Sequence, residues 1–222
     1  MSRPPGRACA KVLAVLYAAL SAANCLAAAK RHHAAEWATK PLLMPVLAAF
    51  ALAAADREDD VRLPAAGLVL SGLGDTALLA ADNAERWFVP GMGAFAAAHA
   101  CYVTALARDG AALRVRPRVA AGYAALWAVL IAVLWRNLGA LRVPVAAYSL
   151  LLVSMAVLAS GRNRAAAAGG ALFVVSDALI AGGLAGINAV PRQESAVMPT
   201  YVAAQFLLAA GFLRPPDGTA RP

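Results

Sequence analysis

Two aspartates lie inside long apolar stretches of this 222-residue chain: Asp75 in LSGLGDTALL and Asp177 in LFVVSDALIA. They are the two carboxylates in all of its apolar stretches together. An aspartate at the centre of a membrane helix costs about 2.5–3.5 kcal/mol on insertion scales. A chain carries such a cost where the carboxyl group is paired, hydrated or used in chemistry. The two aspartates are therefore the first candidates for function.

Two carboxyl groups in unequal environments form a natural acid–base pair, because one can remain protonated near neutral pH while the other is ionised. The protonated acid delivers a proton and the ionised partner activates water. Glycosidases divide the work in this way when they break an acetal through an oxocarbenium-like transition state. The same chemistry suits any bond that breaks to such a cation after protonation, and a site inside a membrane suits a lipid that carries such a bond.

Other polar side chains fall within reach of the aspartates along the apolar stretches. Tyr102 follows His99 by three positions, and such a spacing places both on one helix face. Each polar side chain also has a purely structural reading: a buried histidine, interfacial or packing tyrosines, and a glutamine that bonds neighbouring helices. The candidates for orienting water or substrate are Lys40, His99, Tyr102, Tyr148, Ser149 and Gln205, of which Gln205 shares a helix face with Tyr201.

Lys40 stands just before Pro41, where the second apolar stretch opens. A cation gains nothing from the dipole at a helix N-terminus, which favours anions. Its role is then to pair with an acid or to bind a phosphate. The alternative is an interfacial lysine whose ammonium group extends to the aqueous boundary.

Metal and nucleophile mechanisms find little support in the sequence. His32 and His33 lie in a loop, so a three-ligand zinc site would need His99 together with both aspartates. We expect no metal and no cofactor. The chain has no GxSxG elbow and no phosphate-binding glycine motif in a strand–helix setting. The cysteines, Cys9, Cys25 and Cys101, are scattered and form no paired framework.

The elements that must position these residues are membrane helices. The chain is 62% hydrophobic, and its mean hydropathy of +0.65 reflects long apolar runs. Helix is the expected spanning element, because the backbone must satisfy its own hydrogen bonds in lipid. We predict an all-α, polytopic transmembrane bundle of about eight helices in a single domain, 1–222. The predicted spans are about 10–29, 39–55, 63–80, 87–107, 118–135, 141–160, 165–187 and 196–213.

The net charge of +8 reports topology rather than nucleic-acid binding, because Lys and Arg concentrate in the short loops. The loops on the side of the N-terminus carry 13 Lys and Arg, and those on the other side carry 7. The positive-inside rule then places both termini in the cytoplasm, with the chain in the cell membrane if the source is bacterial. Residues 1–29 also look like a secretory signal, but their apolar run of 18 residues favours a first span.

The aspartates are predicted to lie at matching depths. Asp75 lies about 12 residues, or ~18 Å, into its span, and Asp177 lies similarly deep from the same side. Each follows a small residue, Gly74 or Ser176, so a four-plus-four parallel repeat is an open alternative. Gly182 and Gly186 form a GxxxG pair, which is typical of a packing face. If their helices are neighbours, the two carboxyl groups share a cavity.

Several motifs, taken in order, resemble one known family. They are Lys40-Pro41-Leu42-Leu43-Met44-Pro45; Ser71-Gly72-Leu73-Gly74-Asp75 with Leu78-Leu79; Gly91-Met92 with Phe95, Ala98-His99 and Tyr102; Tyr148-Ser149 with Met155; Leu172-Phe173 with Ser176-Asp177; and Ala204-Gln205. In this order they resemble the YhhN-type lysoplasmalogenases, small integral membrane hydrolases with about eight helices. The resemblance extends over nearly the whole chain.

The resemblance implies hydrolysis of the vinyl ether bond at the sn-1 position of a lysoplasmalogen. The products would be a fatty aldehyde and glycerophospho-ethanolamine or -choline, with Asp75 and Asp177 as the catalytic pair. We expect Asp177 to act as the acid and Asp75 as the base, with Lys40 at the phosphate. The remaining candidates would orient water or the glycerol hydroxyl: His99, Tyr102, Tyr148, Ser149 and Gln205.

Two other classes of function stay open at this point. The chain could be a proton-coupled transporter of a small molecule or lipid, with Asp75 and Asp177 as a proton relay. It could also be a structural or lipid-sensing membrane protein. Release of aldehyde from a lysoplasmalogen separates the hydrolase from both.

Overall fold

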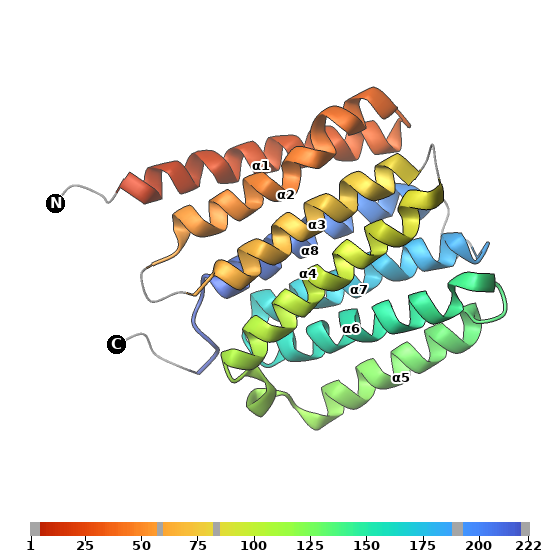
Figure 1. Cartoon of the computed structure of the whole chain (residues 1–222). Coiled ribbons are helices and arrows are strands. Elements are labelled where there is room, and N and C mark those ends of the chain that lie inside the picture. Colours follow the sequence, from red (N-terminus) through yellow and green to blue (C-terminus); the bar gives the residue numbers. More distant parts are fainter. Residues whose placement is uncertain (1–4, 57–59, 82–84, 188–192, 219–222) are drawn as a thin grey trace. The chain divides into compact units, whose positions relative to one another are not determined.

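A computed structural model describes residues 5–56, 60–81, 85–187 and 193–218. These residues form eight long helices and three short 3-10 helices (Figure 1). The long helices are α1 (Pro5–Ala29), α2 (His33–Ala54), α3 (Arg62–Ala81), α4 (Phe88–Arg108), α5 (Pro117–Leu134), α6 (Arg142–Ser160), α7 (Arg164–Leu184) and α8 (Gln193–Phe212). The 3-10 helices are η1 (Glu85–Trp87), η2 (Ala111–Arg114) and η3 (Gly139–Leu141).

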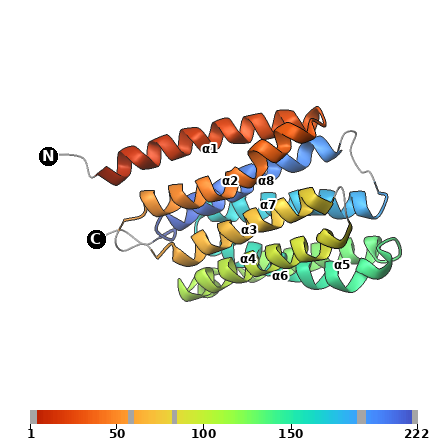
Figure 2. The same cartoon turned by 45° about the horizontal axis from the view of Figure 1, so that its top comes forward.

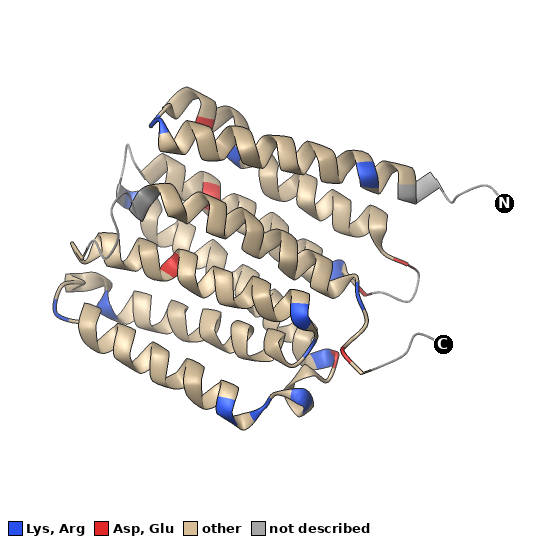
Figure 3. Cartoon of the chain, turned by 180° about the vertical axis from the view of Figure 1, so that it is seen from behind, with Lys and Arg blue, Asp and Glu red and all other residues tan. Residues whose placement is uncertain are grey.

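All eight long helices in the described ranges are long and apolar enough to cross a membrane. Charged residues are sparse along them and gather near their ends and in the loops (Figure 3). The predicted all-α, multi-pass membrane fold is therefore confirmed.

The chain separates into two compact units. Unit 1 comprises Met1–Ala105 and Phe212–Arg214, and thus contains α1, α2, α3 and most of α4. Unit 2 comprises Leu106–Gly211 and Pro215–Pro222, and contains α5, α6, α7 and most of α8. The single domain expected from the sequence stays a prediction.

In unit 1, α2 begins earlier than the apolar run indicates. His32 caps its N-terminus, where the imidazole Nδ1 accepts a hydrogen bond of 3.2 Å from the amide of Ala35. Pro41 and Pro45 consequently lie inside the helix. A proline removes one helical hydrogen bond but is tolerated in membrane helices, where neighbouring groups compensate. Lys40 therefore lies two turns inside α2 instead of at its start.

The glycines of α3 let its neighbours approach closely. A Cβ atom on Gly72 would lie 3.1 Å from the Cβ of Met44 on α2. A Cβ on Gly67 would lie 2.5 Å from the ring of Tyr102 on α4. These contacts fix the rotation of α3, and with it the direction in which its single acid points. Figure 2 shows α1, α2 and α3 of this unit from a second side.

In unit 2, α7 packs against α6 and α8 through adjacent glycines. A Cβ on Gly170 would lie 2.9 Å from the Cα of Ala156 on α6, and one on Gly169 would lie 2.7 Å from the backbone nitrogen of Leu208 on α8. The GxxxG pair predicted as a packing face does not lie on one helix. Gly186 has φ +70° and ends α7, because the amide of Ile187 bonds back to the carbonyl of Gly182 at 2.8 Å.

Candidate active site

Asp75 is the fourteenth residue of α3 and is 3% exposed. Its Oδ1 lies 4.0 Å from the ammonium nitrogen of Lys40 on α2, whose side chain is 18% exposed. The sequence alternative in which Lys40 pairs with an acid is the one seen here. The ion pair supplies a cation beside a carboxylate that has little access to water.

Two further buried side chains of unit 1, Tyr17 and Ser71, were not among the candidate site residues, although Ser71 begins the motif that ends at Asp75. The hydroxyl of Tyr17 on α1 is buried and interacts electrostatically with Asp75 and Tyr102. Ser71, one turn before Asp75, is fully buried, and its hydroxyl has no hydrogen-bond partner within the described residues. Buried hydroxyls are nearly always bonded, so an unsatisfied one marks a place for water or a ligand. The signal available in the sequence was the spacing of four residues from Asp75.

His99 and Tyr102 lie in the packed core of unit 1. His99 is fully buried, and its ring meets that of Tyr102 edge-on with centroids 6.2 Å apart. Tyr102 also stacks on Phe212, at 6.3 Å and an interplanar angle of 30°. His99 and Tyr102 therefore lie on the same face of α4, as their spacing of three residues predicted. Their role in orienting water or substrate stays a prediction.

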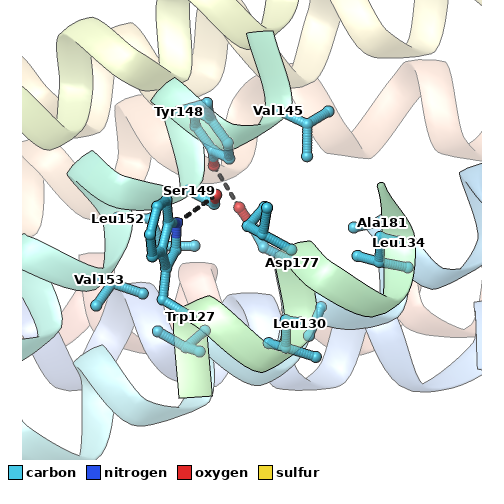
Figure 4. Close-up of a pocket in the computed structure, with 13 residues that line it drawn as sticks. Trp127, Leu130, Leu134, Val145, Tyr148, Ser149, Leu152, Val153, Asp177 and Ala181 are labelled. Carbon is cyan, nitrogen blue, oxygen red and sulfur yellow. Dashed lines mark hydrogen bonds between the residues drawn. The ribbon is translucent and has the colours of Figure 1, made fainter. Parts of the chain in front are cut away.

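Asp177 is the fourteenth residue of α7, in unit 2, and is half-buried. The hydroxyl of Tyr148 on α6 donates a hydrogen bond to its Oδ2. Both side chains line a cavity of about 60 Å³ whose remaining walls are largely apolar, among them Leu130, Leu134 and Leu152 (Figure 4). A carboxyl group and a phenol thus share a small hydrocarbon-lined space.

Ser149 adjoins this cavity, but its hydroxyl is already engaged in two hydrogen bonds. It accepts one of 3.0 Å from the indole Nε1 of Trp127 on α5 (Figure 4). It donates the other, of 3.1 Å, to the carbonyl of Ala146. Ser149 therefore fastens α5 to α6 beside Asp177. The sequence did not single out Trp127, because a tryptophan in an apolar run carries no chemical signal of its own.

Gln205 lies apart from the residues that line the Asp177 cavity. It is fully buried on α8 and donates a hydrogen bond of 3.3 Å to the hydroxyl of Tyr201. Tyr201 in turn meets Phe173 edge-on, with centroids 5.6 Å apart. The predicted common face of Tyr201 and Gln205 is present, and it packs inside unit 2.

The structure therefore shows the two aspartates in two different settings, one in each unit. Asp75 has an ammonium neighbour, whereas Asp177 has a phenol donor and an apolar cavity. The cavity shared by both aspartates stays a prediction, because they belong to different units. No group of three or more His, Cys, Asp or Glu in the described ranges is arranged to hold a metal ion. Chemically, the two settings offer a pair of carboxyl groups in different surroundings.

Comparison with known proteins decides the family. The model of the YhhN family matches residues 35–212, which include every candidate site residue. The chain belongs to the YhhN family.

Two curated relatives of this YhhN protein are the lysoplasmalogenases of Mycobacterium bovis and Mycobacterium tuberculosis. Each is 34% identical to it over 149 residues. The match covers 61% of the present chain and 56% of the relative, so the chain matches little more than half of each relative's length. No solved structure is significantly similar to this YhhN protein.

Proposed function

We propose that this YhhN-family protein hydrolyses the vinyl ether bond at the sn-1 position of lysoplasmalogens. The products are a fatty aldehyde and glycerophospho-ethanolamine or -choline. One observation carries the proposal: two intramembrane carboxyl groups have different partners, an ammonium group for Asp75 and a phenol for Asp177. The name lysoplasmalogenase, which both mycobacterial relatives carry, points to lysoplasmalogens as the substrate on which such a pair would act.

The reaction needs one acid and one base. Asp177, as the acid, transfers its proton to the β-carbon of the vinyl ether, and the π electrons form the new C–H bond. The resulting oxocarbenium ion takes up water, whose proton passes to Asp75. The hemiacetal then collapses: its hydroxyl proton passes to Asp177, the C–O bond to glycerol breaks, and Asp75 returns its proton to the leaving glycerol oxygen. An aldehyde and the free glycerol hydroxyl are released, and both carboxyl groups regain their starting states.

The surroundings of the two carboxyl groups support this division of roles. A nearby cation favours the ionised form of a carboxyl group, which is the form that a base requires. Lys40 supplies that cation to Asp75. An apolar cavity disfavours a charged carboxylate, which suits an acid that must hold its proton before the reaction. Asp177 lines such a cavity, and Tyr148 holds one of its oxygens in place.

The remaining residues have supporting roles in the proposal. The ammonium group of Lys40 has three donors, so it can contact the phosphate of the head group as well as Asp75. His99, Tyr102 and Gln205 would orient the water or the glycerol hydroxyl. The lysophospholipid enters from the membrane, and both termini lie on the cytoplasmic side.

The test is release of fatty aldehyde from lysoplasmenylcholine by the purified protein. We expect the wild type to be active, and Asp75→Asn and Asp177→Asn each to lose about 100-fold or more in kcat, as removal of an acid or base requires. Asp217→Asn is the matched control, because Asp217 is exposed and lies beyond α8. A wild type that releases no aldehyde between pH 5 and 8 but takes up a small molecule or lipid with protons would establish the transporter alternative instead.

A further inference from the structure

An open apolar groove lies between α5 and α7 of unit 2. Its volume is about 380 Å³, and its walls include Gly122 and Leu126 of α5 and Ala171 and Val175 of α7. Leu126 and Val175 are 42% and 47% exposed, so the groove opens outward from the helices. Both helices qualify as membrane spans. In a membrane-spanning unit, an apolar opening of this kind matches hydrocarbon better than water.

The groove adjoins the cavity that holds Asp177 along the same two helices. Val174 lines both spaces. On α5 the walls of the groove end at Leu126, and those of the cavity begin at Trp127. On α7 the two spaces together extend from Ala171 to Ala181, which is ~15 Å at the rise of an α-helix. The open apolar groove and the narrower cavity that contains a carboxyl group thus follow one another along α5 and α7.

We propose that the groove and the cavity form one path, which binds the hydrocarbon chain of a single-chain lipid and directs its polar end toward Asp177. Hydrocarbon is the occupant that the walls match, since the groove has no charged side chain among its lining residues. A polar or cleavable group at the end of that chain would meet Asp177 and Tyr148. The connection between chain binding and cleavage rests on the proposed function, whereas the binding of the chain does not.

Gly122 offers a way to block the path without disturbing the fold. A Cβ atom at this position would meet no other atom within 4 Å, so a larger side chain has space to extend over the groove. Glycine is also a poor helix former, so its replacement does not weaken α5. Gly93 on α4 is the matched control, because a Cβ there also meets nothing within 4 Å and the residue is exposed but does not line the groove.

The first experiment measures binding without catalysis. A lysophosphatidylcholine with a diazirine in its acyl chain is photo-crosslinked to the full-length protein in vesicles, and the labelled peptides are identified by mass spectrometry. We expect labelling of α5 and α7 that excess unlabelled lysophosphatidylcholine suppresses. The labelling should fall severalfold in Gly122→Phe and be unchanged in Gly93→Phe. Labelling spread over all lipid-exposed helices without competition, or unaffected by Gly122→Phe, would overturn the proposal.

A second experiment separates this inference from the proposed function. In the aldehyde assay, Gly122→Phe should lower kcat/KM for a long-chain lysoplasmenylcholine and spare a short-chain one, while Gly93→Phe behaves as the wild type. Equal cleavage of both chain lengths by Gly122→Phe contradicts the connection between groove and site. If the wild type releases no aldehyde, the proposed function fails, and the crosslinking alone decides whether the path binds lipid.

Discussion

The hydrogen bond from Tyr148 to Asp177 joins two residues 29 positions apart in the chain. A hydrogen bond between neutral groups contributes about 0.5–1.5 kcal/mol, and one to a charged group about 1.5–3 kcal/mol. The phenol also fixes the carboxyl group within an apolar cavity, where few other polar groups compete for it. Tyr148 is therefore best understood as a positioning residue for Asp177.

Tyr148→Phe removes this donor and keeps the ring. We expect kcat for aldehyde release to fall about tenfold, which corresponds to ~1.4 kcal/mol, with a smaller change in KM. Steady-state kinetics with lysoplasmenylcholine provide the measurement, and thermal unfolding in detergent verifies that the variant is folded. An unchanged kcat would show that the phenol does not position the acid.

The pair of Lys40 and Asp75 allows a test of coupling. Lys40→Met leaves the buried carboxylate without this cation and should lower both the stability and the activity of the protein. Removal of both charges together relieves the imbalance. We expect the double variant Lys40→Met with Asp75→Asn to be more stable than the two single effects predict, by about 0.5–3 kcal/mol. Chemical unfolding of the four proteins gives this coupling free energy. Additive effects would mean that the 4.0 Å contact contributes nothing.

At the scale of elements, the turn between α6 and α7 holds several chain segments of unit 2 together. Asn163 caps α7 by accepting a hydrogen bond of 3.0 Å from the amide of Ala166, and it donates one of 2.9 Å to the carbonyl of Gly211. Arg162 bonds the same carbonyl at 3.0 Å and forms an ion pair with Asp109. Both turn residues are buried. This network sets the residue at which α7 starts, and therefore how far along the helix axis Asp177 lies.

Asn163→Ala should therefore destabilise the protein by about 1–3 kcal/mol, because it removes a helix cap and leaves a buried carbonyl with fewer donors. Asn137→Ala is the comparison, since Asn137 is exposed and donates one bond, of 3.1 Å, to the carbonyl of Ala185. We expect a change below about 1 kcal/mol there. Thermal unfolding of both variants measures the difference. Equal effects would contradict a special role for the turn.

The sequence anticipated these elements unevenly. The apolar runs identify eight helices, because the length and hydropathy of a span are local properties. They do not reveal that α2 begins at His33, since the capping imidazole lies outside the run and two prolines lie within the helix. They also misassign the packing glycines of α7. Gly186 ends the helix in a left-handed conformation, and Gly169 and Gly170 make the close contacts instead.

At the scale of the whole molecule, the excess of Lys and Arg on one set of loops predicts the orientation in the membrane. Two exposed sites of unit 2 offer a test: Arg136, after α5, and Asp217, after α8. In a background without Cys9, Cys25 and Cys101, we expect Arg136→Cys to react with an impermeant maleimide in intact cells. Asp217→Cys should react only after the membrane is permeabilised. The opposite pattern would reverse the predicted topology.

The sequence by itself determined the class of the protein and pointed to two aspartates as candidate site residues. Spans follow from local hydropathy, and an acid inside a span is conspicuous because its insertion is costly. Only the tertiary structure decided what each acid contacts: Lys40 on α2 for Asp75, and Tyr148 on α6 for Asp177. It also showed that Ser149 bonds Trp127 and that an apolar groove adjoins the cavity of Asp177. Such contacts depend on how each helix is rotated about its axis and shifted along it. Close packing at glycines and the buried turns set this rotation and shift, and no single stretch of sequence encodes them.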